Sequence, residues 1–312
     1  MGTTYSVKIN AVLTEDALTG IRTGIAGVLS AVDRKMSTYL PESELSKINS
    51  NKSSDWQPVS ADLYRVLEQA LYISDVTNGA FDVTIGPLVN LWGFGPAQHD
   101  ERIPPDDEIR TELENTGYRN IELRTEPQSV LKKIPDIYID LSGIAKGYAV
   151  DKVAEYLENS AYTDFMVEIG GEIRARGQNA SGQPWNIGIE KPEPRERSVQ
   201  RATGLRDMSM ATSGDYRNFF EIDGVRYSHT IDPRTGRPVS HNLVSVTVLD
   251  PSASIADATA TGLLVLGPEQ AKQVAENHDI AAYMIIKTGT GFIEVMTSAF
   301  SRYLNDVNSP GH

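Results

Sequence analysis

The chain has 312 residues, of which 42 are acidic and 29 are basic, and it contains no cysteine. Its formal net charge of −13 disfavours nucleic acid as a partner, because phosphate backbones repel an acidic surface. The absence of cysteine excludes disulfides, thiolate metal sites and a cysteine nucleophile, so oxygen and nitrogen groups must carry any chemistry. Every apolar run falls far short of the roughly 20 residues that a membrane-spanning helix needs.

Apolar residues at three- and four-residue spacing predict amphipathic helices along the chain. The first begins after Thr14 and the second after Ser60, and both of these residue types are good N-caps. Further helices are predicted at about 142–157, 256–265 and 269–276. Stretches rich in β-branched residues predict strands at 6–13, 121–123, 137–139, 165–169, 185–189, 225–228, 244–248, 281–286 and 292–296. Because the strands come in groups instead of alternating with helices, an α+β fold is expected.

Two Pro-containing segments, 96–107 and 191–206, are predicted to be exposed loops. Neither loop is long enough to be a domain linker, so residues 1–312 are expected to form one compact unit with two lobes. Several familiar signatures are missing from the sequence: the P-loop, the dinucleotide fingerprint, the Gly-x-Ser-x-Gly elbow and the His-x3-His zinc spacing.

Residues 139–148 (IDLSGIAKGY) are predicted to run from a strand through a Gly-containing turn into a helix. Free N–H groups at such a helix start favour an anion, and an exposed carbonyl in the turn can ligate a hard cation. The same pattern equally fits a strand–turn–helix in which the glycines only permit close packing.

Asp257 and Thr261 are four residues apart, so a helix would place a carboxylate and a hydroxyl on one face. Both are hard oxygen ligands of the kind that Mg²⁺ accepts together with phosphate oxygens. The alternative is that Asp257 caps the helix and that the Thr261 hydroxyl bonds to a backbone carbonyl.

Two further segments combine groups that suit binding or catalysis. Residues 228–238 (SHTIDPRTGRP) offer a histidine for acid–base chemistry and arginines for phosphate, although a tight turn with an internal ion pair also fits. Residues 79–95 (GAFDVTIGPLVNLWGFG) place an aromatic side chain beside a carboxylate, which suits a flat ring. A buried aromatic turn would have the same sequence pattern.

Together these segments resemble the ApbE family, the FAD:protein FMN transferases. Eight blocks follow the family's order: MGTTYSV at 1–7, MSTYLPESELS at 36–46, the segment 79–95, DLSGIAKGYAVD at 140–151, VEIGGE at 167–172, TSGDYR at 212–217, the segment 228–238 and ADATAT at 256–261. The resemblance implies an α+β fold of the family's own kind, related to T-fold enzymes, with a cleft for FAD. It also implies Mg²⁺-dependent transfer of FMN from FAD to a Thr or Ser hydroxyl of a target protein, with release of AMP.

Carried over position by position, the resemblance implies that Mg²⁺ is held by the side chains of Asp257 and Thr261 and by the carbonyl near Gly143. It implies FAD contacts at the positions of Met1, Tyr39, Ala80, Phe81, Asp82, Asp140, Lys146 and Ile231. Tyr39 is then the stacking candidate, and Lys146 can balance phosphate charge. His229 is a candidate for deprotonating the acceptor hydroxyl or steadying the pyrophosphate.

The resemblance also sets expectations about partners and compartment. The expected acceptors are flavin-bearing subunits of Na⁺-pumping NADH:quinone reductase or Rnf-type complexes. Relatives usually carry an export signal, often with a lipidated cysteine, ahead of the first block. We therefore expect the full-length protein to be a periplasmic, inner-membrane lipoprotein whose leader is missing from this chain. Two other functions stay open: hydrolysis of FAD to FMN and AMP, and FAD binding without turnover.

Overall fold

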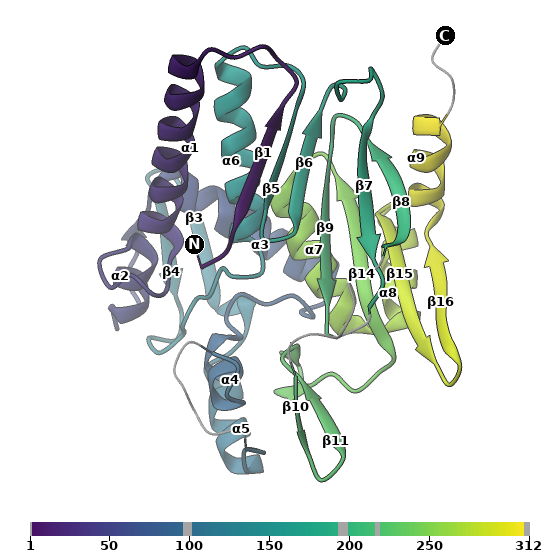
Figure 1. The fold of residues 1–312 in the computed structure, drawn as a ribbon. Coiled ribbons are helices and arrows are strands. Elements are labelled where there is room, and N and C mark those ends of the chain that lie inside the picture. Colours follow the sequence, from purple (N-terminus) through teal and green to yellow (C-terminus); the bar gives the residue numbers. More distant parts are fainter. Residues whose placement is uncertain (1, 96–101, 193–198, 216–218, 309–312) are drawn as a thin grey trace.

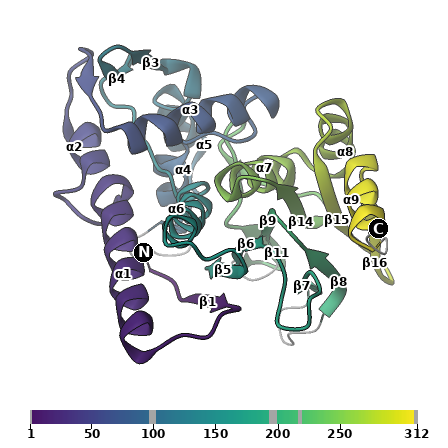
Figure 2. The same ribbon diagram turned by 90° about the horizontal axis from the view of Figure 1, so that it is seen from above.

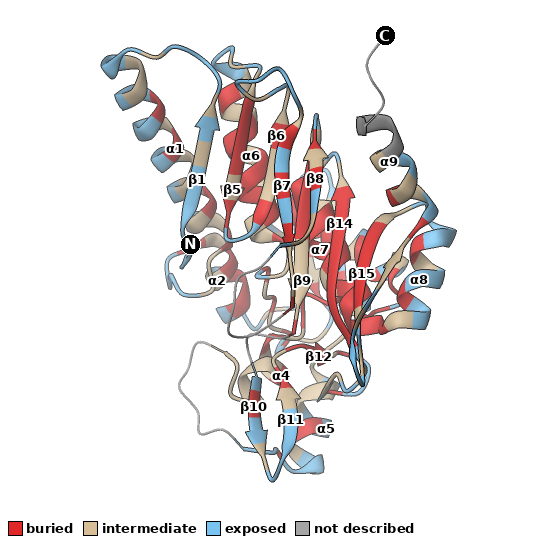
Figure 3. Cartoon of the chain, turned by 45° about the vertical axis from the view of Figure 1, so that its right-hand side comes forward, coloured by how far each residue is buried: buried red, intermediate tan, exposed pale blue. Residues whose placement is uncertain are grey.

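The computed structural model describes residues 2–95, 102–192, 199–215 and 219–308 of the chain. An antiparallel sheet lies at its centre (Figure 1), with seven strands in the described part of the chain, in the order β1-β5-β6-β9-β14-β15-β16. Its strands are β1 (Tyr5–Ile9), β5 (Phe165–Ile169), β6 (Glu172–Arg176), β9 (Met208–Gly214), β14 (Leu243–Asp250), β15 (Ala281–Thr288) and β16 (Gly291–Met296). The sheet is covered on both faces, and all but the last residue of β14 are buried (Figure 3).

Helices cover one face of this sheet, as the view from above shows (Figure 2). They are α1 (Glu15–Met36), α3 (Ala61–Val76), α6 (Ala145–Asn159), α7 (Ala253–Leu266) and α8 (Pro268–Asn277). The other face packs against the hairpin of β7 (Trp185–Glu190) and β8 (Val199–Leu205) and against α9 (Ser298–Asn308). Successive side chains of β15 lie on opposite faces of the sheet: Met284 packs among the helices, whereas Tyr283 packs against Phe300.

Smaller elements flank the helices and the lower end of the sheet (Figure 1). Helix α2 (Glu44–Ser50) packs beside α1, and a small sheet of β2 (Gln57–Pro58), β4 (Gln128–Lys132) and β3 (Ile121–Thr125) packs against α3 through β4. A lower lobe contains the helices α4 (Gly86–Leu91) and α5 (Asp106–Glu114). It also contains the hairpin of β10 (Phe219–Ile222) and β11 (Val225–Ser228) and the pair of β12 (Ile231–Asp232) and β13 (Arg237–Pro238). The 3-10 turn η1 (Tyr118–Asn120) leads into β3. Within the described residues, no helix is long and apolar enough to cross a membrane.

The α+β prediction is confirmed, and so are the predicted starts of the first two long helices. The Thr14 side chain accepts a hydrogen bond from the backbone N–H of Ala17, and Ser60 accepts one from Leu63. The predicted loop at 191–206 is wrong in part, because its C-terminal half forms strand β8. Residues 193–198 and 96–101 of the predicted loops lie outside the described residues.

The predicted strand at 137–139 is wrong, because these residues belong to no strand or sheet. The side-chain amide of Asn49 takes the place of a neighbouring strand: its Nδ2 donates to the Ile139 carbonyl and its Oδ1 accepts from the Ile139 N–H, both at 2.8 Å. Downstream, the Asp140 N–H donates to the Val83 carbonyl at 2.7 Å. These contacts hold the turn that leads into α6.

Helices α6 and α7 cross closely at Gly147, and we predict that Gly147→Ala destabilises the protein. A Cβ atom built on Gly147 would overlap the backbone carbonyl of Ala253 and lie 2.7 Å from Ser254 Cα. Backbone atoms cannot rotate away, so the helices must separate, at a cost of about 1–3 kcal/mol in unfolding free energy. Chemical denaturation followed by circular dichroism measures this cost.

The matched control is Gly27→Ala on α1, where a Cβ atom would meet nothing within 4 Å. Because alanine favours an exposed helix, this variant is expected to gain about 0.5–1 kcal/mol of stability. Equal effects of the two substitutions would contradict the close approach of α6 and α7.

Candidate active site

The N-terminus of α7 is tied to α6 through Asp151. The Asp151 carboxylate accepts from the backbone N–H groups of Ala253 at 2.9 Å and Ser254 at 3.0 Å, and from the Ser252 hydroxyl at 2.9 Å. Arg174 on β6 forms an ion pair with the same carboxylate at 2.9 Å. One buried side chain therefore joins two helices and the sheet, and it sets the position of α7.

One turn further along α7, Asp257 lies buried against the start of α6. Its Oδ2 atom accepts from the Gly147 N–H at 3.1 Å, and its two oxygens lie 3.3 and 3.4 Å from Lys146 Nζ. Ser252, whose side chain accepts from the Ile255 N–H, caps this helix, so the capping alternative for Asp257 does not hold. Asp257 presents its carboxylate to charged and polar groups of α6 instead.

Thr261 follows Asp257 by one turn and extends the same row of oxygens. Its hydroxyl lies 3.0 Å from the Ser213 hydroxyl on β9, and a Cβ atom built on Gly143 would lie 3.8 Å from the Thr261 methyl group. The structure thus brings Gly143, Asp257 and Thr261 to one place, although Gly143 is more than a hundred residues away in the sequence.

Lys146 is shared between two buried carboxylates. Its ammonium lies 3.3 Å from Glu172 on β6 and 3.3 Å from Asp257. Burial alone would lower the pKa of Lys146, but the charges of Asp257 and Glu172 raise it above its ordinary value, so the group stays protonated. Burial, assisted by the charge of Asp257, raises the pKa of Glu172, and Lys146 opposes that rise.

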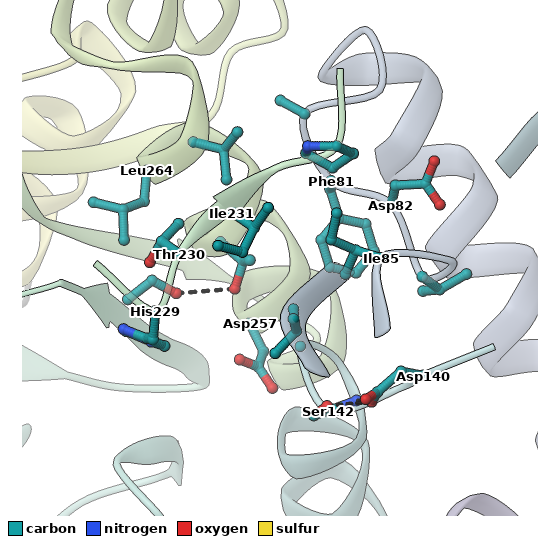
Figure 4. Close-up of a pocket in the computed structure, with 18 of the residues that line it drawn as sticks. Phe81, Asp82, Ile85, Asp140, Ser142, His229, Thr230, Ile231, Asp257 and Leu264 are labelled. Atoms are coloured by element: carbon teal, nitrogen blue, oxygen red, sulfur yellow. Dashed lines mark hydrogen bonds between the residues drawn. The ribbon is translucent and has the colours of Figure 1, made fainter. Parts of the chain in front are cut away.

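These groups line a pocket of about 390 Å³ between the sheet and the lower lobe (Figure 4). A second, more apolar pocket of about 600 Å³ runs beside α1 and shares Asp140, Ser142 and Lys146 with the first. Tyr39 lines the second pocket and is 73% exposed, so its ring is available for stacking. Because Lys146 lines both pockets, an elongated ligand that occupied both of them would pass beside its side chain.

Most of the predicted site residues lie on the first pocket: Ala80, Phe81, Asp82, Asp140, Gly143, Lys146, His229, Ile231, Asp257 and Thr261. Tyr39 lies on the second, and Met1 lies outside the described residues. The roles assigned to these residues stay predictions, since geometry alone does not test them.

The Asp82 carboxylate accepts hydrogen bonds from Thr84 in its own loop and from Tyr118 in η1. It accepts from the Thr84 N–H at 2.8 Å, the Thr84 hydroxyl at 2.6 Å and the Tyr118 N–H at 2.8 Å. Burial raises the pKa of this carboxyl, against the hydrogen bonds from Thr84 and Tyr118. In Figure 4 the carboxylate points away from Asp257 and His229. Its placement suits a side chain that holds the loop carrying Phe81.

His229 forms part of the pocket wall opposite this loop (Figure 4). Its ring meets the Phe94 ring edge-on, with the centroids 6.3 Å apart. The buried carboxyl of Asp215 feels the charges of Arg226, His241 and His229, which oppose the rise in its pKa that burial causes.

Two groups of the site were missed by the sequence reasoning. Glu172 and Ser213 both line the first pocket and contact predicted site residues. Both belong to the blocks that carry the family resemblance, VEIGGE and TSGDYR, but a single carboxylate or hydroxyl on a strand has no spacing that indicates a role.

The donor set suits a hard divalent cation. The carboxylate of Asp257 and the hydroxyls of Thr261 and Ser213 are oxygen ligands, and a buried Oε2 atom of Glu172 lacks a hydrogen-bond partner among the described residues. The Lys146 ammonium already places positive charge beside them. The described residues contain no group of three or more His, Cys, Asp or Glu that could hold a metal.

A buried carboxylate, two hydroxyls and an ammonium lie where the walls of the two pockets share residues, and this set of groups suits an anionic ligand. The model of the ApbE family matches residues 1–284. The chain belongs to the ApbE family.

Relatives and solved structures cover nearly all of the chain. A Vibrio cholerae protein called FAD:protein FMN transferase is 48% identical over 306 residues, covering 98% of this chain and 91% of the relative. A protein of the same name from Escherichia coli K12 is 43% identical over 278 residues, covering 88% of this chain and 79% of the relative. The solved flavin transferase ApbE from Vibrio cholerae matches with a TM-score of 0.88 at 46% identity, covering 97% of this chain and 96% of that one. The apo flavinyl transferase ApbE from Pseudomonas stutzeri matches with a TM-score of 0.88 at 37% identity, covering 97% and 94%.

Proposed function

We propose that this chain is a Mg²⁺-dependent FAD:protein FMN transferase, which moves FMN from FAD to a Thr or Ser hydroxyl of an acceptor protein and releases AMP. Its place among the flavinyl transferases rests on family membership and on the relatives of that name. The proposed Mg²⁺ and FAD site is supported by the position of Lys146, which lines both pockets and has the Asp257 and Thr261 oxygens beside it in the first.

The proposed reaction is a phosphoryl-type transfer that needs little covalent participation from the protein. The acceptor oxygen attacks the phosphorus of the FMN half, the bond to the bridging oxygen breaks, and AMP leaves with that oxygen. Lys146 balances charge on the pyrophosphate, and His229 receives the proton of the acceptor hydroxyl. Mg²⁺ held by Asp257, Thr261 and the carbonyl near Gly143 would neutralise the charge that develops on the phosphate oxygens.

Mass spectrometry of an acceptor domain after incubation with FAD and Mg²⁺ tests the transfer. The expected result is an FMN adduct on a Thr or Ser residue, with one AMP released for each adduct. Release of AMP at the same rate without acceptor would favour FAD hydrolysis, and FAD that stays intact in the presence of Mg²⁺ and acceptor would favour a binding protein.

His229→Asn is predicted to slow transfer and to leave FAD binding nearly unchanged. Asparagine keeps much of the side-chain volume but cannot take up a proton, and loss of a general base costs about 10²- to 10⁴-fold in rate. Single-turnover AMP release measures the rate, and flavin fluorescence measures FAD affinity. A loss of affinity as large as the loss of rate would assign His229 to substrate binding instead.

The acceptor and compartment are proposed on the family resemblance alone. We propose a flavin-bearing subunit of a Na⁺-pumping NADH:quinone reductase or Rnf-type complex as acceptor, and the periplasm as the place of reaction. Purified subunits of the two kinds can be compared as substrates in the mass spectrometric assay, and fractionation of cells that express the full-length gene tests the compartment.

A further inference from the structure

Lys146 has two anionic partners, and only one of them is needed for the proposed cation site. Its Nζ atom lies 3.3 Å from Asp257 Oδ1 and 3.3 Å from Glu172 Oε1. The carboxylates are buried, with 3% and 4% of their side chains exposed, whereas 32% of the lysine side chain is exposed. The ammonium therefore bridges two carboxyl groups that have almost no contact with solvent of their own.

A divalent cation on Asp257 would change this balance. It would bring two positive charges to the carboxylate that the ammonium now shares, so like-charge repulsion would drive Lys146 away from Asp257. The Lys146 ammonium is at the end of a long flexible side chain. Without a second ion-pair partner it would therefore move out along the pocket wall. Glu172 lies on the neighbouring strand β6 and belongs to no predicted ligand set.

Glu172 is the anchor that the described part of the pocket offers. Its Oε1 atom contacts Lys146, and its buried Oε2 atom lacks a hydrogen-bond partner among the described residues. The other lining carboxylates have different tasks: Asp82 binds Thr84 and Tyr118, and Asp140 accepts from the Ser142 N–H at 2.8 Å.

We propose that Glu172 is a positioning residue, which keeps Lys146 at the junction of the two pockets once a cation occupies Asp257. Lys146 thereby changes from a partner of Asp257 to a partner of the ligand pyrophosphate, with Glu172 bound to it throughout. The inference rests on the proposed cation site, and it concerns binding of FAD rather than transfer.

FAD affinity of Glu172→Gln, measured by flavin fluorescence with Mg²⁺ and with EDTA, tests the proposal. The substitution removes a negative charge beside an anionic ligand, so simple electrostatics predicts tighter binding. We expect the opposite with Mg²⁺, a loss of roughly tenfold, because the ammonium loses its anchor. With EDTA the loss should be smaller, since Asp257 still holds Lys146. Chromatography after each titration confirms that the FAD is intact.

Two further variants complete the test. Lys146→Met should lose as much FAD affinity in Mg²⁺ as Glu172→Gln, and the double variant should lose no more than Lys146→Met alone. Glu168→Gln on β5 is the matched control, because Glu168 accepts from the Gly171 N–H and, within the described part of the chain, forms no hydrogen bond or ion pair with Lys146. It should bind FAD like the parent protein.

Tighter or unchanged FAD binding by folded Glu172→Gln in Mg²⁺ would overturn the proposal, and so would additive losses in the double variant. If Glu172→Gln fails to fold, Glu172→Asp retains the charge at a shorter reach and should show a smaller loss with the same dependence on Mg²⁺. Failure of the proposed function would appear separately, as absence of an FMN adduct while FAD binding follows the pattern above.

Discussion

Replacing Asp257 with asparagine is expected to abolish FMN transfer while the protein stays folded. Asp257 is 2% exposed, and asparagine can still accept the hydrogen bond that Gly147 donates to this side chain at 3.1 Å. What is lost is the negative charge that a hard cation needs as ligand. Because metal-assisted charge stabilisation contributes several kcal/mol, the rate should fall by about 10³-fold or more.

Single-turnover release of AMP in the presence of acceptor measures this fall, and circular dichroism checks the fold. Asp250→Asn is the matched control, because Asp250 is a half-buried carboxylate at the end of β14 that accepts from the Ser252 N–H at 2.7 Å. It should retain transfer. Removal of Mg²⁺ with EDTA should bring the parent protein down to the level of Asp257→Asn, and added Mg²⁺ should rescue only the parent. Transfer by Asp257→Asn within about tenfold of the parent would contradict the cation site.

Replacing Asp151 with alanine is expected to cause the largest loss of stability. Asp151 accepts from two N–H groups at the start of α7 and forms the 2.9 Å ion pair with Arg174. Removing the Asp151 carboxylate leaves two α7 N–H groups without their acceptor and leaves the partly buried Arg174 with only its longer pair to Glu158, so a loss of about 3–5 kcal/mol is expected. Urea denaturation followed by circular dichroism measures the loss.

Glu158→Ala is the control for this prediction. Glu158 pairs with Arg174 at 3.4 Å and with Arg176 at 3.0 Å, but its side chain is 26% exposed. Such a solvated pair contributes about 0–1 kcal/mol. Similar losses in the two variants would show that Asp151 acts as an ordinary surface partner rather than as the link between α6, α7 and β6.

Local patterns predicted those parts of the fold that depend on neighbouring residues. The helices after Thr14 and Ser60 follow from apolar spacing and N-capping, and both caps are present. The strand predicted at 137–139 failed because its partner is the side chain of Asn49, 90 residues away, and no window along the chain contains both. Strand β9 was missed because its small polar residues resemble a loop, although the neighbouring strands bury it.

The sequence by itself determined the family, the α+β class and the candidate set of oxygens and charges, since these depend on residue identity and on spacing within one element. Only the tertiary structure decided which of these groups meet. Lys146 and Asp257 are 111 residues apart, and the crossing of α6 and α7 at Gly147 brings them together. Glu172 contacts Lys146 because strand β6 packs beside α6. The Asp82 carboxylate instead accepts hydrogen bonds from Thr84 and Tyr118. Such pairings follow from packing between distant elements, which leaves no periodic pattern in the chain.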